Sequence, residues 1–183
     1  MLVILKRLLI VIKASCNWGE MLRLRAFQTD DTSLLINYLN NPEVVRFLSS
    51  KIPTPYTIDD ARWWIETGSK AGHTFAIELS GHFVGRIGAV AGEFEYSKSA
   101  EVGYWLAQEY WGQAIVSQAI ALLIEKIQQN NEIVRLHAVV FEVNARSAKV
   151  LEKVGFAQEG CLHKAIYKQG DFHNALVYGK VIA

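Results

Sequence analysis

The stretch from Glu101 to Ile124 constrains the fold most, because it changes from a strand pattern to a helix pattern across one short turn. Side chains alternate in character along Glu101–Leu106, which predicts a strand over about 100–107. After a turn at Tyr110–Ala114, apolar residues recur at helical spacing, which predicts a helix over Gly112–Gln129. The chain therefore places a strand, a turn of small residues and a helix N-terminus in direct succession.

The beginning of such a helix is suited to binding an anion. Its first N–H groups have no partner within the helix, and the helix dipole directs its positive end outward. We expect this turn to hold the pyrophosphate of a coenzyme, and the preceding strand to carry acid–base chemistry. The expected amide donors are those of Gly112, Gln113, Ala114, Ile115 and Val116. The alternative for Gly112 taken alone is an ordinary turn glycine.

Composition narrows the class of protein. With 183 residues, of which 51% are hydrophobic, the chain suits one domain. Its net charge of +1 argues against a nucleic-acid partner, which needs a clustered basic surface. Two cysteines are too few for a disulfide framework, and no Cys/His spacing resembles a metal site, so we expect no metal.

Residues 1–20 are apolar and cationic, and we expect them to form an N-terminal extension before a single domain at 21–183. The apolar run is shorter than the ~20 residues that span a membrane. A signal peptide would carry its charges before this run, whereas Lys6 and Arg7 lie within it. The alternatives are an element packed on the domain, a weak membrane-surface helix or a leader translated from an early start codon. No stable membrane insertion is expected, and the protein is predicted to be cytoplasmic.

The order of the remaining elements predicts an α/β or α+β fold with a mixed sheet. Expected helices begin near Thr32, Glu43, Ile58 and Asn144, in addition to the long helix above, and Ser49–Tyr56 is expected to be a loop. Strands are expected at 21–27, 73–79, 82–90, 100–107, 133–141, 156–162 and 176–182.

Four motifs occur in order along the chain: Leu22–Arg25 (LRLR), Glu101–Leu106 (EVGYWL), Glu109–Ile115 (EYWGQAI), and Asn144–Ser147 followed by Leu151–Phe156 (NARS…LEKVGF). In this combination the chain resembles the GNAT superfamily of acyltransferases. The resemblance is closest to the branch of Rim-type (RimJ/RimL-like) ribosomal-protein N-terminal acetyltransferases, and it extends over about residues 21–182.

The resemblance implies a mostly antiparallel central sheet of about seven strands, flanked by helices and splayed between the strands at 100–107 and 133–141. It implies acetyl-CoA as acyl donor and a primary amine as acceptor, with the amine attacking the thioester directly. The acceptor could be a protein N-terminus or a small amine such as a polyamine, an amino sugar or an amino-acid derivative. Related enzymes are monomers or homodimers.

The resemblance also implies roles for individual residues. Glu101 would be the general base, with its pKa raised by partial burial; the alternative is an exposed strand glutamate paired with a lysine. Ser147 would protonate the leaving thiolate, or else is an ordinary first-turn serine. Asn144 would line the pantetheine arm as well as cap its helix. The backbone amide near Leu106 would face the thioester carbonyl.

Aromatic residues surround these positions. Trp111 belongs to the coenzyme loop, and Tyr104, Trp105 and Tyr56 are candidates for the walls of the acceptor channel. Core packing explains most such aromatic side chains equally well.

The turn also departs from the family pattern, because Ala114 stands where glycine is usual and Val116 where alanine or glycine is usual. If position 114 requires a positive φ, alanine costs roughly 1–2 kcal/mol there. Val116 adds a branched side chain near the expected phosphates. The alternative function is therefore a noncatalytic acyl-CoA-binding or regulatory relative.

Overall fold

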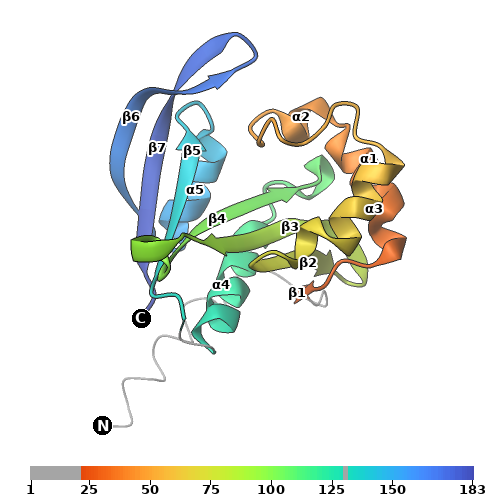
Figure 1. Cartoon of the computed structure of the whole chain (residues 1–183), viewed down its shortest axis with the longest axis horizontal. Helices are drawn as coiled ribbons and strands as arrows, with labels where there is room; N and C mark the ends of the chain where they lie inside the picture. The colour runs from red at the N-terminus through yellow and green to blue at the C-terminus, as the bar shows by residue number, and fades with distance from the viewer. Residues whose placement is uncertain (1–21, 130–131) are drawn as a thin grey trace.

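The computed structural model describes residues 22–129 and 132–183, so the expected extension at 1–20 lies outside the described residues. Seven strands form one sheet in the order β1-β2-β3-β4-β5-β7-β6. They are β1 (Leu22–Arg25), β2 (His73–Leu79), β3 (His82–Ala91), β4 (Ser99–Leu106), β5 (Arg135–Phe141), β6 (Ala157–Lys168) and β7 (Asp171–Val181). All neighbours are antiparallel except β4 and β5, which confirms the mixed, mostly antiparallel sheet (Figure 1).

Helices cover both faces of this sheet. The helices are α1 (Thr32–Leu39), α2 (Pro42–Val45), α3 (Ile58–Glu66), α4 (Ile115–Gln128) and α5 (Ala145–Lys153). One buried core contains side chains of α4 and α5, and a second contains those of α1, α2 and α3. We call the first the α4 face and the second the α3 face.

The sheet separates between β4 and β5. These parallel strands are in register only where Ser99–Glu101 meets Arg135–His137. Beyond this point β5 continues along β7 over its whole length, while β4 continues along β3 (Figure 1). The two halves of the sheet therefore diverge from a common base, as the resemblance implied, and leave one edge of β4 without a strand partner.

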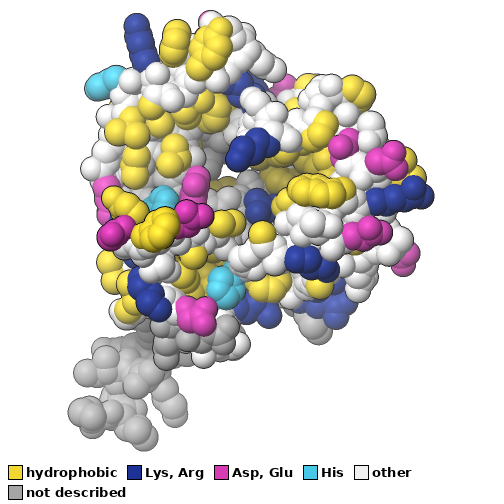
Figure 2. Space-filling model, in the orientation of Figure 1, with side chains coloured by type: hydrophobic (Ala, Val, Ile, Leu, Met, Phe, Trp, Pro, Cys, Tyr) yellow, Lys and Arg dark blue, Asp and Glu magenta, His cyan; other side chains and the backbone are white. Residues whose placement is uncertain are grey.

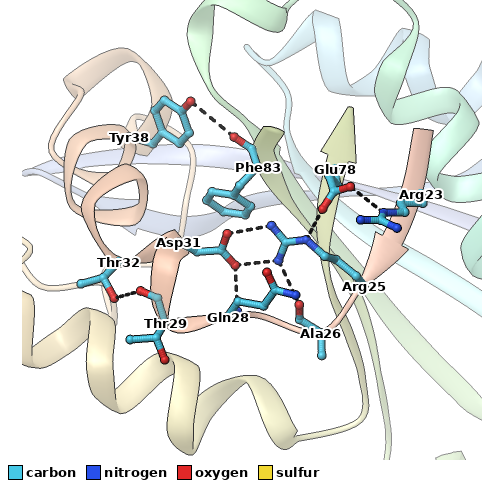
Figure 3. Close-up of polar contacts among 10 residues, drawn as sticks. All are labelled: Arg23, Arg25, Ala26, Gln28, Thr29, Asp31, Thr32, Tyr38, Glu78 and Phe83. Atoms are coloured by element: carbon cyan, nitrogen blue, oxygen red, sulfur yellow. Dashed lines mark hydrogen bonds and ion pairs between the residues drawn. The ribbon is translucent and has the colours of Figure 1, made fainter. Parts of the chain in front are cut away.

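An ion network fixes β1 to β2 and to the start of α1 (Figure 3). The two terminal nitrogens of Arg25 donate to both carboxylate oxygens of Asp31 at 2.7 Å, and its Nε donates to Glu78 at 2.5 Å. Arg23 donates to the other oxygen of Glu78 at 2.5 Å. Asp31 and Glu78 are buried, so each carboxylate receives the charged donors that burial demands.

Two expected boundaries were wrong. The last two strands are longer than predicted and form a hairpin that turns at Gly170. Apolar and polar residues do not alternate regularly in its exposed outer half, so the prediction ended both strands short of the turn. The long helix begins at Ile115 rather than Gly112, because both Gly112 (φ 78°) and Ala114 (φ 59°) have left-handed backbone conformations.

The outer end of this hairpin contacts the other side of the molecule. Lys168 donates to the carbonyl oxygens of Val45, at 3.1 Å, and Leu48, at 2.5 Å, near the end of α2. Phe141 at the end of β5 lies 5.4 Å from Phe47, measured between ring centroids. These contacts close the separation between the two halves of the sheet at its wide end.

Candidate active site

A large cleft occupies the space between the diverging strands. Its volume is about 1450 Å³, and its walls come from β4, β5, the start of α4, α5, and the segments around α2 and α3. Figure 2 shows the surface hollowed between the β6–β7 side and the α1–α3 side, with hydrophobic side chains around the hollow. The cleft thus reaches both faces of the sheet past the free edge of β4.

The start of α4 lines this cleft with unpaired backbone donors. Within the described residues, no N–H group from Gly112 to Ser117 donates to a backbone carbonyl or to a side chain. The positive end of a helix of 14 residues adds to these donors. The predicted amide donors are therefore gathered at one wall of the cleft, in an arrangement suited to a phosphate.

Two residues of this turn had raised doubts about phosphate binding. Ala114 adopts a left-handed conformation, with φ 59° and ψ 13°. The backbone strain expected for alanine at a positive φ is therefore present. The Val116 side chain is half-buried and packs against the core of the α4 face. A branched side chain at position 116 thus has a packing role.

Cationic side chains lie along the same part of the cleft. Arg146, Lys149 and Lys153 all line it from α5. The Arg146 guanidinium lies 5.0 Å from the ring centroid of Trp111, which joins α5 to the coenzyme loop. These three side chains thus line the same cleft as the unpaired amides.

The free edge of β4 presents the backbone of Leu106 to the cleft. The N–H of Ala107 donates to Val84 on β3, and peptide groups alternate in direction along an antiparallel strand, so those of Leu106 face away from β3. The Leu106 carbonyl accepts a 3.0 Å hydrogen bond from Nε1 of Trp111, whereas its N–H has no partner within the described residues. This N–H is positioned as the resemblance implied for a donor to a thioester oxygen.

On the α4 face, Tyr104 and Ser147 form a hydrogen-bonded pair in the wall of the cleft. Their hydroxyl oxygens are 2.8 Å apart, and the Tyr104 hydroxyl also lies 3.3 Å from the Ser147 carbonyl oxygen. Burial raises the pKa of Tyr104 to about 12, although the hydrogen bond with Ser147 opposes this shift. Asn144 caps α5 by accepting from the Ser147 N–H at 3.3 Å. The expected capping role of Asn144 is confirmed.

Glu101 also lines the cleft, but from the opposite face of β4. Side chains alternate along a strand, so Glu101, Gly103 and Trp105 point to the α3 face while Tyr104 points to the α4 face. The expected partial burial of Glu101 was wrong, because its side chain is exposed. The described residues contain no lysine or arginine within ion-pair distance of Glu101, so the structure does not support the alternative of a paired surface glutamate.

The remaining aromatic candidates border the cleft on the α3 face. Trp105 and Tyr56 touch it, yet both are buried in the core of that face. Tyr56 is also held by Asn40, whose side chain bonds both its N–H and its carbonyl. These side chains therefore act mainly in packing, and only a small part of each is available to a ligand.

Comparison with known proteins assigns the fold to a family. The family model described as acetyltransferase (GNAT) domain matches residues 21–157. The chain belongs to this GNAT acetyltransferase family. The enzyme class predicted from the sequence, an acetyltransferase, is confirmed at the level of the family.

Individual relatives include Rim-type enzymes. A ribosomal-protein-serine acetyltransferase of Escherichia coli (strain K12) is 35% identical over 86 residues, which cover 47% of this chain and 48% of that protein. An acetyltransferase from Salmonella typhimurium, described as modifying the N-terminal serine of ribosomal protein L7/L12, has 26% identity and a TM-score of 0.75, covering 88% of this chain and 95% of that one. RimL, a ribosomal L7/L12 alpha-N-protein acetyltransferase in complex with coenzyme A, matches in fold at 24% identity and a TM-score of 0.77, covering 87% and 93%.

Arg86 on β3 is a residue of the cleft that was not predicted from the sequence of this GNAT domain. Arg86 lines the cleft on the α3 face, and its Nε is fully enclosed without a hydrogen-bond partner in the described residues. The available signal was one arginine inside the otherwise apolar strand 82–90, where a charged residue requires an explanation.

The described parts of the GNAT domain lack a metal-binding cluster and a membrane-spanning helix. Residues 22–129 and 132–183 contain no cluster of three or more histidine, cysteine, aspartate or glutamate side chains that could hold a metal ion. Over the same residues, none of the helices has the length and apolar character required to cross a membrane.

Proposed function

We propose that this protein is an acetyl-CoA-dependent N-acetyltransferase that transfers the acetyl group to a primary amine by direct attack. One observation carries the proposal. A single cleft joins the unpaired amides of Gly112 to Ser117, the Tyr104–Ser147 pair and the Glu101 carboxylate across the free edge of β4. Donor and acceptor can therefore approach each other from opposite faces of the sheet.

The donor side fits a coenzyme that carries phosphates. The amides at the start of α4 supply directed donors, and Arg146, Lys149 and Lys153 supply positive charge nearby. The structural relative RimL, described as a complex with coenzyme A, supports this choice of ligand. The Leu106 N–H would then donate to the thioester oxygen as negative charge develops on it.

In the proposed reaction, the amine nitrogen attacks the thioester carbonyl carbon, forming a C–N bond as the C–S bond breaks. Glu101 removes the proton that the ammonium must lose, directly or through a water molecule. The leaving sulfur takes its electron pair and a proton, giving free thiol and an amide. Because no covalent enzyme intermediate is needed, positioning of the two substrates supplies much of the rate.

Ser147 is the proposed donor of the proton to the sulfur, and Tyr104 positions it. With a pKa of about 12, the Tyr104 hydroxyl remains protonated at neutral pH and can hold the Ser147 hydroxyl in a fixed direction. A proton from solvent, balanced by the second proton that the amine nitrogen releases as it becomes an amide, would return Ser147 to its protonated state after each cycle.

A thiol-release assay with acetyl-CoA and a panel of amines tests the proposal. We expect amine-dependent release by the wild type, and a reduced rate for Ser147→Ala. A control variant, Ser33→Ala, alters an exposed serine of α1 outside the cleft. Intact turnover in Ser147→Ala would remove Ser147 from the mechanism, and no release with any amine would contradict the proposed activity.

A second candidate function is a noncatalytic acyl-CoA-binding protein, which the strained conformation of Ala114 favours. Calorimetry separates the candidates, because this alternative retains acetyl-CoA binding while thiol release with amines is absent. The predicted cytoplasmic location and the monomeric or homodimeric state remain proposals.

A further inference from the structure

Arg86 is a partly buried cation without an ion-pair or hydrogen-bond partner in the described residues. Within the described residues it makes no ion pair and no hydrogen bond, and its Nε is fully enclosed. Burial lowers the pKa of Arg86, but arginine starts so high that it stays charged at neutral pH. A buried charge normally requires a partner, because the desolvation cost is otherwise uncompensated.

The surroundings of Arg86 hold its guanidinium in one place. Gly88 and Gly103 lie opposite each other on β3 and β4, beneath the guanidinium. A Cβ built on Gly88 would lie 3.1 Å from one terminal nitrogen, and one on Gly103 would lie 3.4 Å from the other. The Trp64 ring centroid lies 5.3 Å from the guanidinium carbon. A glycine floor and an indole wall therefore leave room for this planar group beside the cleft.

The position of Arg86 relative to Glu101 defines what it could bind. Its guanidinium lies over Gly103, which is two residues from Glu101 on the same face of β4. Two residues of strand span about 6.6 Å. The two side chains therefore rise from neighbouring positions on one face of the sheet, where a single small head group can hydrogen-bond to both. A molecule with an amine and a carboxylate on one carbon would reach both side chains.

We propose that the acceptor carries a carboxylate close to its reactive amine, and that Arg86 binds this carboxylate while Glu101 receives the proton of the amine. The planar guanidinium presents two parallel donors, which match the two oxygens of a carboxylate. The inference rests on the acetylation proposed above, and it narrows the acceptor to an amino acid or to a chain whose first residue is acidic.

The test pairs substrates that differ only in the carboxylate. The thiol-release assay is run with acetyl-CoA on free amino acids and on their amides, and on peptides that begin with aspartate or with asparagine. The variants are Arg86→Gln, Arg86→Lys and the control Arg62→Gln, which changes an exposed arginine of α3 outside the cleft. Melting temperature and acetyl-CoA affinity show whether each variant is folded.

For at least one substrate pair, we expect the wild-type kcat/KM to be about 10- to 100-fold higher for the carboxylate than for its amide. Most of this difference should come from a lower KM for the carboxylate. Arg86→Gln should abolish this preference, Arg86→Lys should retain part of it, and Arg62→Gln should leave it unchanged. A preference among free amino acids identifies the α-carboxylate as the ligand, and a preference only among the peptides identifies the acidic side chain.

Different failures have different meanings. Equal wild-type rates on acids and amides, or turnover confined to amines without a carboxylate, would overturn the role of Arg86 while the acetylation stands. In Arg86→Gln, an equal loss of kcat/KM on a carboxylate substrate and on its amide would also overturn the role of Arg86. Absence of turnover with every amine would contradict the acetylation itself and this inference with it.

Discussion

Two arginines on the same sheet, Arg25 and Arg86, are both partly buried but differ in whether carboxylates surround them. Arg25 on β1 donates to the buried carboxylates of Asp31 and Glu78, and these contacts raise its pKa (Figure 3). Among the described residues no carboxylate pairs with Arg86 on β3, and burial lowers the pKa of Arg86. The chain thus supplies the counter-charge for one guanidinium and leaves the other without one.

The location of each arginine explains the difference. Arg25 lies where β1, β2 and the start of α1 must be joined, and away from the cleft. Arg86 lies in the wall of the cleft, with the exposed Glu101 on the same face. We infer that the first network stabilises the fold, whereas the charges of the cleft are reserved for a ligand. The two sites should therefore respond to substitution in different measurements.

The largest expected effect is on turnover, from Glu101→Gln. Loss of a general base should lower turnover by roughly 10²–10⁴-fold, whereas the free energy of unfolding should barely change because the side chain is exposed. Steady-state kinetics at saturating substrate and urea unfolding measure the two quantities. Glu95→Gln, an exposed glutamate outside the cleft, is the control. Unchanged turnover would exclude Glu101 as the base.

The next effect is on stability, from Arg25→Met. The substitution leaves Asp31 without a charged donor and should lower the free energy of unfolding by about 3–5 kcal/mol, measured by urea denaturation. Arg23→Met is the matched control, because Arg23 binds the same Glu78 but is exposed, and should cost less than about 1 kcal/mol. Equal losses in the two variants would contradict the structural role given to Arg25.

Arg86→Met completes this comparison. A cation without a partner contributes no pairing energy, so its replacement by an apolar side chain should leave stability unchanged or increase it. The same urea titration measures the effect. A loss as large as that of Arg25→Met would show that Arg86 has a structural partner after all.

A smaller effect is expected in the turn before α4, from Ala114→Gly. Glycine relieves roughly 1–2 kcal/mol of left-handed strain but gives back about 0.4–1 kcal/mol through the entropy of the unfolded chain. The net result should be a stabilisation of about 1 kcal/mol or less in urea unfolding. Ala121→Gly in the exposed interior of α4 should do the opposite, with a loss of about 1 kcal/mol. A destabilised Ala114→Gly would contradict the conformation of the turn.

The smallest effect concerns acid stability. Hydrogen bonding from Arg23, assisted by Arg25, holds the pKa of Glu78 below its usual value despite burial. Its stabilising contribution should be complete above the ordinary glutamate pKa of about 4.3 and be lost as pH falls through the folded-state value. The free energy of unfolding, measured with urea, should therefore fall less steeply between about pH 6 and pH 3 in Glu78→Gln than in the wild type. Parallel curves would contradict the role of Glu78.

Local patterns in the sequence predicted most of the fold. Alternation predicted the core strands, including those at 73–79 and 82–90, which join at Ser80-Gly81, where both residues have positive φ. The Thr57 cap of α3 and the Asn144 cap of α5 were also recognisable, because cap chemistry lies within a few residues. The outer half of the β6–β7 hairpin was not recognisable, because it is largely exposed, including Tyr167 and Phe172, and so lacks a burial pattern.

The candidate site could be predicted only in part. The motifs indicated Glu101, Ser147 and the turn at Gly112–Val116, and the cleft brings them together. The pairing of Tyr104 with Ser147 and the unpaired state of Arg86 depend on packing between distant elements. The exposure of Glu101 likewise depends on which distant elements cover its face of β4, which a local pattern does not encode.

A crystal structure of the protein with acetyl-CoA tests the central claim most directly. The account predicts the coenzyme between β4 and β5, with its pyrophosphate at the amides of Gly112 to Ser117. The thioester carbonyl should lie within hydrogen-bond distance of the Leu106 N–H and the sulfur near Ser147. A coenzyme bound outside this cleft, or a pyrophosphate away from the start of α4, would contradict it.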